Sequence, residues 1–113
     1  MASAFDVIAE PQRRRILDLL CEHERPVGQL VEHLALSQPA VSKHLRVLRE
    51  AGLVGVRQEG QRRVYAVRAD RLREVDEWLA PYRAMWSRSL RDLERHLAEM
   101  PEKPAKSGRS RHA

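Results

Sequence analysis

The strongest constraint on the fold is a change of hydrophobic period at Gly52. Before it, apolar residues recur at spacings of four and three, which places them on one face of a helix; these residues are Val41, Leu45 and Leu48. After it, the side chains of residues 54–58 and 63–67 follow a period of two, as where Val54 and Val56 alternate with Gly55 and Arg57. This period is typical of strands. Gly60 lies between these segments and supplies a turn position with positive φ. The pattern predicts a helix followed directly by a β-hairpin.

The helix has clear start and stop signals. Ser37 is a good N-cap, and Pro39 is tolerated only in a first turn, so we expect the helix to start near Gln38. Gly52 can take the left-handed conformation that follows many helix C-termini. At 100° per residue, a second set of side chains projects away from the apolar face. This outward set is Pro39, Ser42, Lys43, Arg46 and Glu50.

Three shorter helices are predicted before this one. They cover Ala4 to Ala9, a segment that starts at Pro11 and ends before Pro26, and Val27 to Leu36. The last of them is separated from the helix near Gln38 by only a short turn. This order is typical of a helix-turn-helix, whose second helix enters the DNA major groove. A hairpin directly behind it indicates a wing, so the fold class is mainly α with a small β-hairpin, a winged helix-turn-helix.

Positive charge is concentrated on the predicted DNA-reading segment. The chain has 113 residues and a formal net charge of +5. Residues 37–68 hold seven Lys and Arg residues against two Glu residues, Glu50 and Glu59. A positive centre suits a polyanion, because phosphate contacts release counterions. The charge alone fits a soluble basic surface equally well. It therefore supports DNA binding only together with the helix-turn-helix pattern.

A long helix is predicted from Asp70 onward, with Asp70 as its N-cap. Its apolar residues recur at a mean spacing of 3.5, which is a heptad-like seam that needs a partner helix. Pro81 is expected to kink or break the helix. Together with Phe5, Val7 and Ile8 of the first helix, the seam predicts a homodimer. Its expected interface residues are Phe5, Ile8, Leu79, Tyr82, Trp86, Leu90, Leu93 and Leu97.

The remaining composition bounds the protein further. We expect one domain over residues 1–100 and a disordered basic tail over 101–113, which lacks periodicity. There is no signal-peptide core and no apolar run long enough for a bilayer, so a cytoplasmic protein without membrane contact is expected. The single cysteine, Cys21, cannot form an internal disulfide.

Two segments resemble a known family. The run LSQPAVSKHLRVLREAGLV at 36–54, followed by VRQEGQRRVYAV at 56–67, resembles the ArsR/SmtB family of winged-helix repressors. The run FDVIAEPQRRRILDLL at 5–20 is similar to that family's second-helix region. The resemblance implies a homodimer that binds a palindromic operator in double-stranded DNA and is released by an inducer. It implies DNA contacts from Ser37, Gln38, Pro39, Ala40, Ser42, Lys43, His44, Arg46, Arg57, Arg62 and Arg63.

These residues are expected to differ in role. Gln38 and Lys43 are the best candidates for reading base edges, because both project outward near the helix start. Arg46 is a better candidate for a phosphate contact. Ser37 is expected to act chiefly as a cap, and His44 to pack or to contact phosphate. Wing arginines suit phosphates or the minor groove.

The metal-binding signals of the family are missing. The region VGQLVEHL lacks the cysteine pair that binds soft metals in one branch. Asp92, His96 and Glu99 lie on one helical face, but the second ligand pair that such a site needs is absent. A solvated charged face explains these three residues better. No metal ion and no cofactor are therefore expected.

The last helix contains a further resemblance. The run WLAPYRAMW at 78–86 resembles a subgroup found beside genes for lipid-cavity proteins of the SRPBCC fold. This resemblance implies a small organic molecule or a stress response as the regulated process, with an unidentified small-molecule inducer. The alternative is that Trp78, Tyr82 and Trp86 simply build the dimer core.

Four possible functions can be compared. A dimeric transcriptional repressor that is released by a non-metal signal, with its own gene as one candidate target, explains the basic helix and the wing. A winged helix used for protein contact leaves those basic residues unexplained, and a metal-responsive repressor needs a site that the sequence does not reveal. An enzyme is not expected, because no nucleophile–base pair, ligand set or glycine-rich phosphate loop is present.

Overall fold

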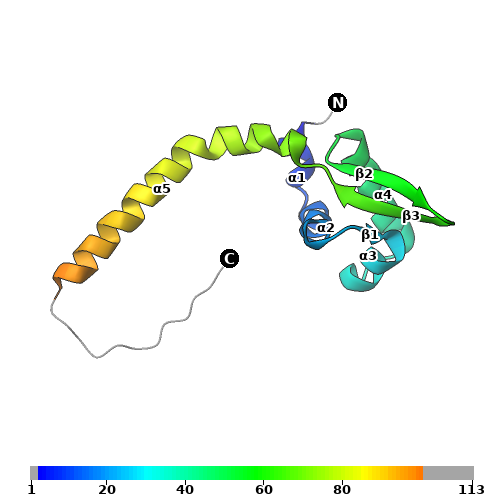
Figure 1. Ribbon diagram of the computed structural model, residues 1–113, viewed down its shortest axis with the longest axis horizontal. Coiled ribbons are helices and arrows are strands. Elements are labelled where there is room, and N and C mark those ends of the chain that lie inside the picture. Colours follow the sequence, from blue (N-terminus) through cyan, green and yellow to red (C-terminus); the bar gives the residue numbers. More distant parts are fainter. Residues whose placement is uncertain (1–2, 101–113) are drawn as a thin grey trace. The chain divides into compact units, whose positions relative to one another are not determined.

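The computed structural model describes residues 3–100 (Figure 1). Its chain divides between Leu79 and Ala80, inside the last helix, into two structural units. The elements in order are α1 (Ala4–Ile8), α2 (Pro11–Glu22), β1 (Arg25–Pro26), α3 (Val27–Leu34), α4 (Gln38–Glu50), β2 (Val54–Glu59), β3 (Arg62–Val67), the 3-10 turn η1 (Ala69–Leu72) and α5 (Arg73–Glu99). The predicted class, mainly α with a small β-hairpin, is confirmed. The predicted tail over 101–113 lies outside the described residues.

The core of the first unit is formed by the apolar faces that the periodicity predicts. The α4 face is fully covered, since Val41, Leu45 and Leu48 are each at most 1% exposed. Side chains of α2 and α3 pack against it, including the fully buried Ile16 and Leu30. Burial of this face fixes which side of α4 remains open to solvent.

The helix-turn-helix has the boundaries that its capping residues dictate. The Ser37 hydroxyl accepts a hydrogen bond from the Ala40 amide at 3.2 Å, which caps α4. Gly52 follows α4 with a φ of +79°, as expected of a residue that ends a helix. One boundary differs: α3 ends at Leu34 and not at Leu36, because Ala35 adopts a left-handed φ of 56°.

The wing is a β-hairpin whose turn has two residues, Gly60 and Gln61. Strands β2 and β3 pair antiparallel from Val54↔Val67 to Glu59↔Arg62, and Gly60 adopts a φ of +62° in the turn. The sheet has a third strand that the sequence did not predict, because β1 pairs with β3 in the order β1-β3-β2. Arg25 of β1 is buried and donates from Nε to the Leu19 carbonyl at 3.1 Å.

The first helix docks on the start of α5. Ser3 and Asp6 form a capping box on α1, and Glu74 accepts a hydrogen bond from the Ala4 amide at 3.3 Å. The rings of Phe5 and Trp78 meet edge to face at a centroid distance of 5.9 Å. Val7 is only 1% exposed. Its predicted place in a dimer interface was therefore wrong, because its side chain fills the core of its own chain.

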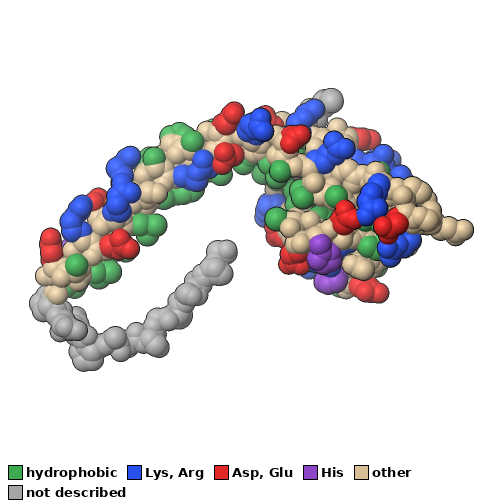
Figure 2. All heavy atoms as spheres, viewed as in Figure 1, with side chains coloured by type: hydrophobic (Ala, Val, Ile, Leu, Met, Phe, Trp, Pro, Cys, Tyr) green, Lys and Arg blue, Asp and Glu red, His purple; other side chains and the backbone are tan. Residues whose placement is uncertain are grey.

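Helix α5 begins later than predicted and continues through its proline. Asp70 lies inside η1, and Arg73 is the first residue of α5, so the prediction of Asp70 as the N-cap was wrong. Of the two outcomes expected at Pro81, a kink or a break, the break does not occur, since α5 contains Pro81. From Ala80 to Met100 every residue is exposed. Hydrophobic side chains are visible along α5 in Figure 2, and within residues 3–100 no helix is long and apolar enough to cross a membrane.

Candidate nucleic-acid interface

The open side of α4 carries polar and basic side chains. Gln38, Ser42, Lys43 and Arg46 are all exposed, opposite the buried face of the same helix. Within the described part of the chain, none of these four side chains has a hydrogen-bond or ion-pair partner. They are therefore available to an external ligand. Pro39 is exposed in the first turn, whereas Ala40 is only half-exposed.

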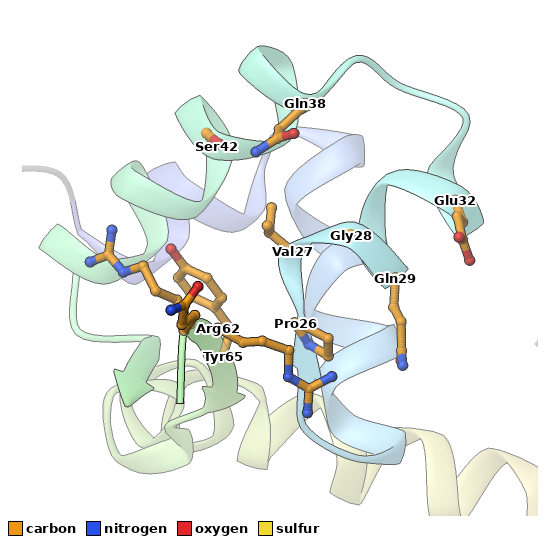
Figure 3. Close-up of a pocket in the computed structure, with 11 residues that line it drawn as sticks. Pro26, Val27, Gly28, Gln29, Glu32, Gln38, Ser42, Arg62 and Tyr65 are labelled. Carbon is orange, nitrogen blue, oxygen red and sulfur yellow. The ribbon is translucent and has the colours of Figure 1, made fainter. Parts of the chain in front are cut away.

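A groove joins the start of α4 to the wing. Its volume is about 550 Å³, and it is bounded by the start of α3, by α4 and by β3 (Figure 3). Figure 3 shows Gln38 and Ser42 on α4 and Arg62 on the wing around it. The lining residues are Pro26, Val27, Gly28, Gln29, Glu32, Gln38, Ser42, Gln61, Arg62, Arg63 and Tyr65.

The groove unites only part of the predicted DNA-contact set. Gln38 and Ser42 line it together with Arg62 and Arg63, two arginines that are at least 20 positions later in the sequence. Lys43, Arg46 and Arg57 lie outside this lining. The sequence did not reveal the contribution of α3, where Gln29 and Glu32 line the same groove. Glu32 places one negative charge there.

Two wing arginines are paired with carboxylates. Arg62 Nη2 lies 2.7 Å from Glu59 Oε1, and Arg57 Nη1 lies 3.2 Å from Glu59 Oε2. Arg57 also forms an ion pair with Glu24, which precedes β1. The Arg62 and Arg57 guanidinium groups lower the pKa of Glu59 through their hydrogen bonds. The hydrogen bond to Glu24, followed by the one to Glu59, raises the pKa of Arg57.

Sequence reasoning did not find these carboxylates. Glu59 could have been found, because the hairpin places it directly opposite Arg62. Glu24 gives no such signal, since it is 33 residues before Arg57. Arg63 is exposed like Arg57 and Arg62, but it differs from them because it forms no ion pair among residues 3–100.

His44 lies at the inner edge of α4, as expected. Its ring is half-buried, and its Nδ1 atom is inaccessible without a hydrogen-bond partner among the described residues. The Arg13 backbone amide lowers the pKa of Glu10, at the start of α2. The position of His44 favours packing over reading of base edges.

The carboxylates and histidine near the end of α5 do not assemble into a metal site within one chain. Asp92 forms an ion pair with Arg95, one turn further along the helix. Across residues 3–100, no three His, Cys, Asp or Glu side chains lie together in a way that could hold a metal ion.

Comparison with known proteins identifies the family. The sequence profile described as "Bacterial regulatory protein, arsR family" matches residues 10–56, from the start of α2 into β2. The chain is 33% identical over 79 residues to the transcriptional repressor SdpR of Bacillus subtilis, covering 70% of this chain and 88% of SdpR. It belongs to the ArsR family. This chain is therefore a DNA-binding transcriptional regulator.

Two other similar proteins extend the match to structure. The regulator Rv0081 of Mycobacterium tuberculosis is 38% identical over 92 residues, covering 80% of this chain and 78% of Rv0081. Its crystal structure superposes with a TM-score of 0.57 over 78% of this chain and 86% of that one. A possible transcriptional regulator for arsenical resistance has a TM-score of 0.65 at 36% identity, covering 90% of this ArsR-family chain and all of that one.

Proposed function

We propose that the protein is a homodimeric repressor that binds a palindromic operator with the first turns of α4 and with the wing. The observation that carries this proposal is the exposed, unpartnered set on α4, whose first members share a groove with Arg62 and Arg63. A helix with one buried and one open polar side is what major-groove reading requires. The ArsR family consists of transcriptional regulators, so an operator is the expected target.

The residues divide by role in this proposal. Gln38 and Lys43 read base edges, because both are exposed in the first two turns of α4. Arg46 and Arg62 contact phosphates, since they lie further along the helix and at the wing tip. Arg63 adds a wing contact and has no competing carboxylate among residues 3–100. Arg57 contacts DNA only after it exchanges Glu24 or Glu59 for phosphate.

The other predicted contacts are mainly positional. Ser37 holds the first turn through its cap, so its hydroxyl is engaged in the DNA-free protein. Pro39, Ala40 and Ser42 are small side chains that allow close approach of α4 to the groove floor. His44 supports α4 from its inner edge.

The dimer is proposed to form through α5 and the exposed part of α1. Large apolar side chains are left open along the heptad-like seam: Trp86 is 54% exposed, Leu90 62% and Leu97 57%. A surface of this kind is costly to leave in water and marks an interaction site. Tyr82 and Leu93 follow the same spacing, and Leu79, Phe5 and Ile8 belong to the proposed interface at its other end. Residues 1–100 are proposed as one DNA-binding and dimerisation domain, with 101–113 as a separate tail.

A repressor is favoured over an activator because SdpR, which this chain covers over 88% of its length, is named a repressor. Release by a non-metal signal is proposed because the cysteine pair is absent from VGQLVEHL. The competing hypothesis is release by a metal ion at a site shared between two subunits.

Fluorescence anisotropy with DNA from the protein's own promoter region tests the proposal. The wild type is compared with Lys43→Ala and with the matched control Arg88→Ala, which removes the same charge from α5. We expect tight binding by wild type and control, and weaker binding by Lys43→Ala. Equal affinity of all three proteins for promoter and random DNA would contradict sequence reading by α4 and would favour a protein-contact role.

A further inference from the structure

Three arginine side chains gather at the base of the wing, away from the groove described above. Arg49 lies in the last turn of α4, Arg68 follows β3, and Arg71 lies in η1. They line a second open groove of about 380 Å³. The other lining residues are Gly52, Val54, Gly55, Val56 and Asp70.

None of these three arginines is paired with a carboxylate among residues 3–100. Other arginines of residues 3–79 outside the proposed DNA-binding surface have side-chain partners, such as Arg25 with Glu22 and Arg15 with Gln12. The side chains of Arg49, Arg68 and Arg71 have neither an ion pair nor a hydrogen bond in the described chain. Asp70 is the only carboxylate lining their groove, and it forms no ion pair with them. Three positive charges against one negative charge leave the groove net positive, and a positive surface attracts anions.

Two glycines create the space that the arginines occupy. A Cβ atom on Gly55 would lie 2.7 Å from Arg68 Nε, and one on Gly52 would lie 3.2 Å from Arg71 Cγ. Any larger residue at Gly55 would therefore displace the Arg68 guanidinium. Both arginine side chains therefore lie close to the backbone at these two glycines.

The groove is separate from the proposed DNA-binding surface. Gly55 is four positions before Glu59 at the wing tip, which is about 13 Å at the usual rise of a strand. Gln38 is eleven positions before Arg49, which is about 16 Å along the helix. Lys43 and the wing-tip arginines do not line this groove.

We propose that Arg49, Arg68 and Arg71 form a binding site for a phosphate-type dianion. Guanidinium groups present planar pairs of donors that match phosphoryl oxygens, and three of them provide the charge that a dianion needs. The phosphoryl group has two conceivable sources: a small phosphorylated molecule free in solution, or a backbone phosphate of DNA that flanks the operator. Arg49 belongs to α4, so an occupied site contacts the helix that is proposed to read DNA.

The first source is tested by titrating the DNA-free protein with pyrophosphate. Binding is measured from the NMR signals of the arginine Nε–H groups. We compare wild type with Arg68→Ala/Arg71→Ala and with Gly55→Ala, which displaces Arg68 without removing a charge. Arg73→Ala is the matched control, because Arg73 is exposed, has no partner among residues 3–100 and lies outside the groove. Thermal unfolding verifies that each variant is folded. We expect saturable binding by wild type and control, weakened at least tenfold in the other two proteins.

The second source is tested by the salt dependence of DNA affinity. If DNA supplies the phosphoryl group, free protein shows no saturable pyrophosphate binding, but Arg68→Ala/Arg71→Ala lowers the slope of log affinity against log salt by about two relative to Arg73→Ala. Either result supports the site and names its ligand. The proposal is overturned if pyrophosphate does not saturate wild type, or binds all variants equally, and the salt slope is also unchanged. The pyrophosphate experiment contains no DNA, so its result is independent of the proposed operator binding.

Discussion

Glu59 and Arg62 face each other across the end of the wing, with Arg62 Nη2 2.7 Å from Glu59 Oε1. The Glu59 carboxylate is paired with the same Arg62 guanidinium that is proposed to contact a DNA phosphate. The other Glu59 oxygen accepts a hydrogen bond from Arg57 at 3.2 Å, so one residue engages two wing arginines. DNA must compete with Glu59 for both of them.

Glu59→Gln is therefore expected to raise DNA affinity. The substitution removes a competing acceptor charge and a negative charge that would approach phosphates, so operator and random DNA should both bind about two- to fivefold more tightly, the range typical of a surface ion pair. Anisotropy titrations at fixed salt measure this, with Glu99→Gln at the far end of α5 as the control for net charge. Unchanged or weaker binding by Glu59→Gln would show that its ion pairs position the wing for DNA.

Lys43→Ala and Arg62→Ala are expected to act differently. Loss of a base contact costs about 1–3 kcal/mol at one operator position, whereas loss of a phosphate contact weakens binding to every sequence and lowers the salt slope by about one. Affinity for operator and random DNA across a salt series separates these effects. If Arg62→Ala changes sequence preference and Lys43→Ala weakens all DNA alike, the assigned roles of wing and helix are reversed.

Charged residues in the α5 seam are expected to abolish the dimer. Trp86→Glu/Leu90→Glu places two carboxylates where the proposed partner helix packs, so the protein should become a monomer or unfold. Sedimentation velocity at micromolar concentration measures the mass. Arg88→Glu is the control, because helical spacing places it opposite Trp86 and Leu90. A wild-type protein that is monomeric and still binds DNA with full affinity would refute the dimer.

Operator affinity is expected to be insensitive to metal ions. The third-helix cysteine pair is absent, and Asp92 is engaged by Arg95. The measurement is operator affinity after exhaustive chelation and again with a few equivalents of zinc. A tenfold change, which corresponds to about 1.4 kcal/mol of coupling, would reveal a site formed between subunits.

Local patterns account for what the sequence predicted. Val41, Leu45 and Leu48 face the core, and Ser37, Gly52 and Gly60 take the cap and turn conformations that their residue types favour. Each of these features depends on residues that are close in sequence, so periodicity and capping preferences were sufficient to find them.

Features that depend on distant partners were missed. Arg25 and Pro26 form a strand only because Tyr65 and Val64 pair with them, and two residues show no alternation of their own. The pairing of Arg57 with Glu24 has the same origin, since it joins residues 33 positions apart. An apolar residue such as Val7 can lie in a dimer interface or in the core of its own chain. The docked position of α1 shows that Val7 lies in the core.

Footprinting of the wild-type protein on its promoter tests the central claim most directly. Two copies of α4 related by a two-fold axis enter successive major grooves, so protection should cover an imperfect palindrome with half-site centres about 10–11 base pairs apart, or a multiple of that spacing. Lys43→Ala should weaken both half-sites together. Protection of a single asymmetric half-site would contradict the account. Protection that is unchanged in Lys43→Ala would contradict it as well.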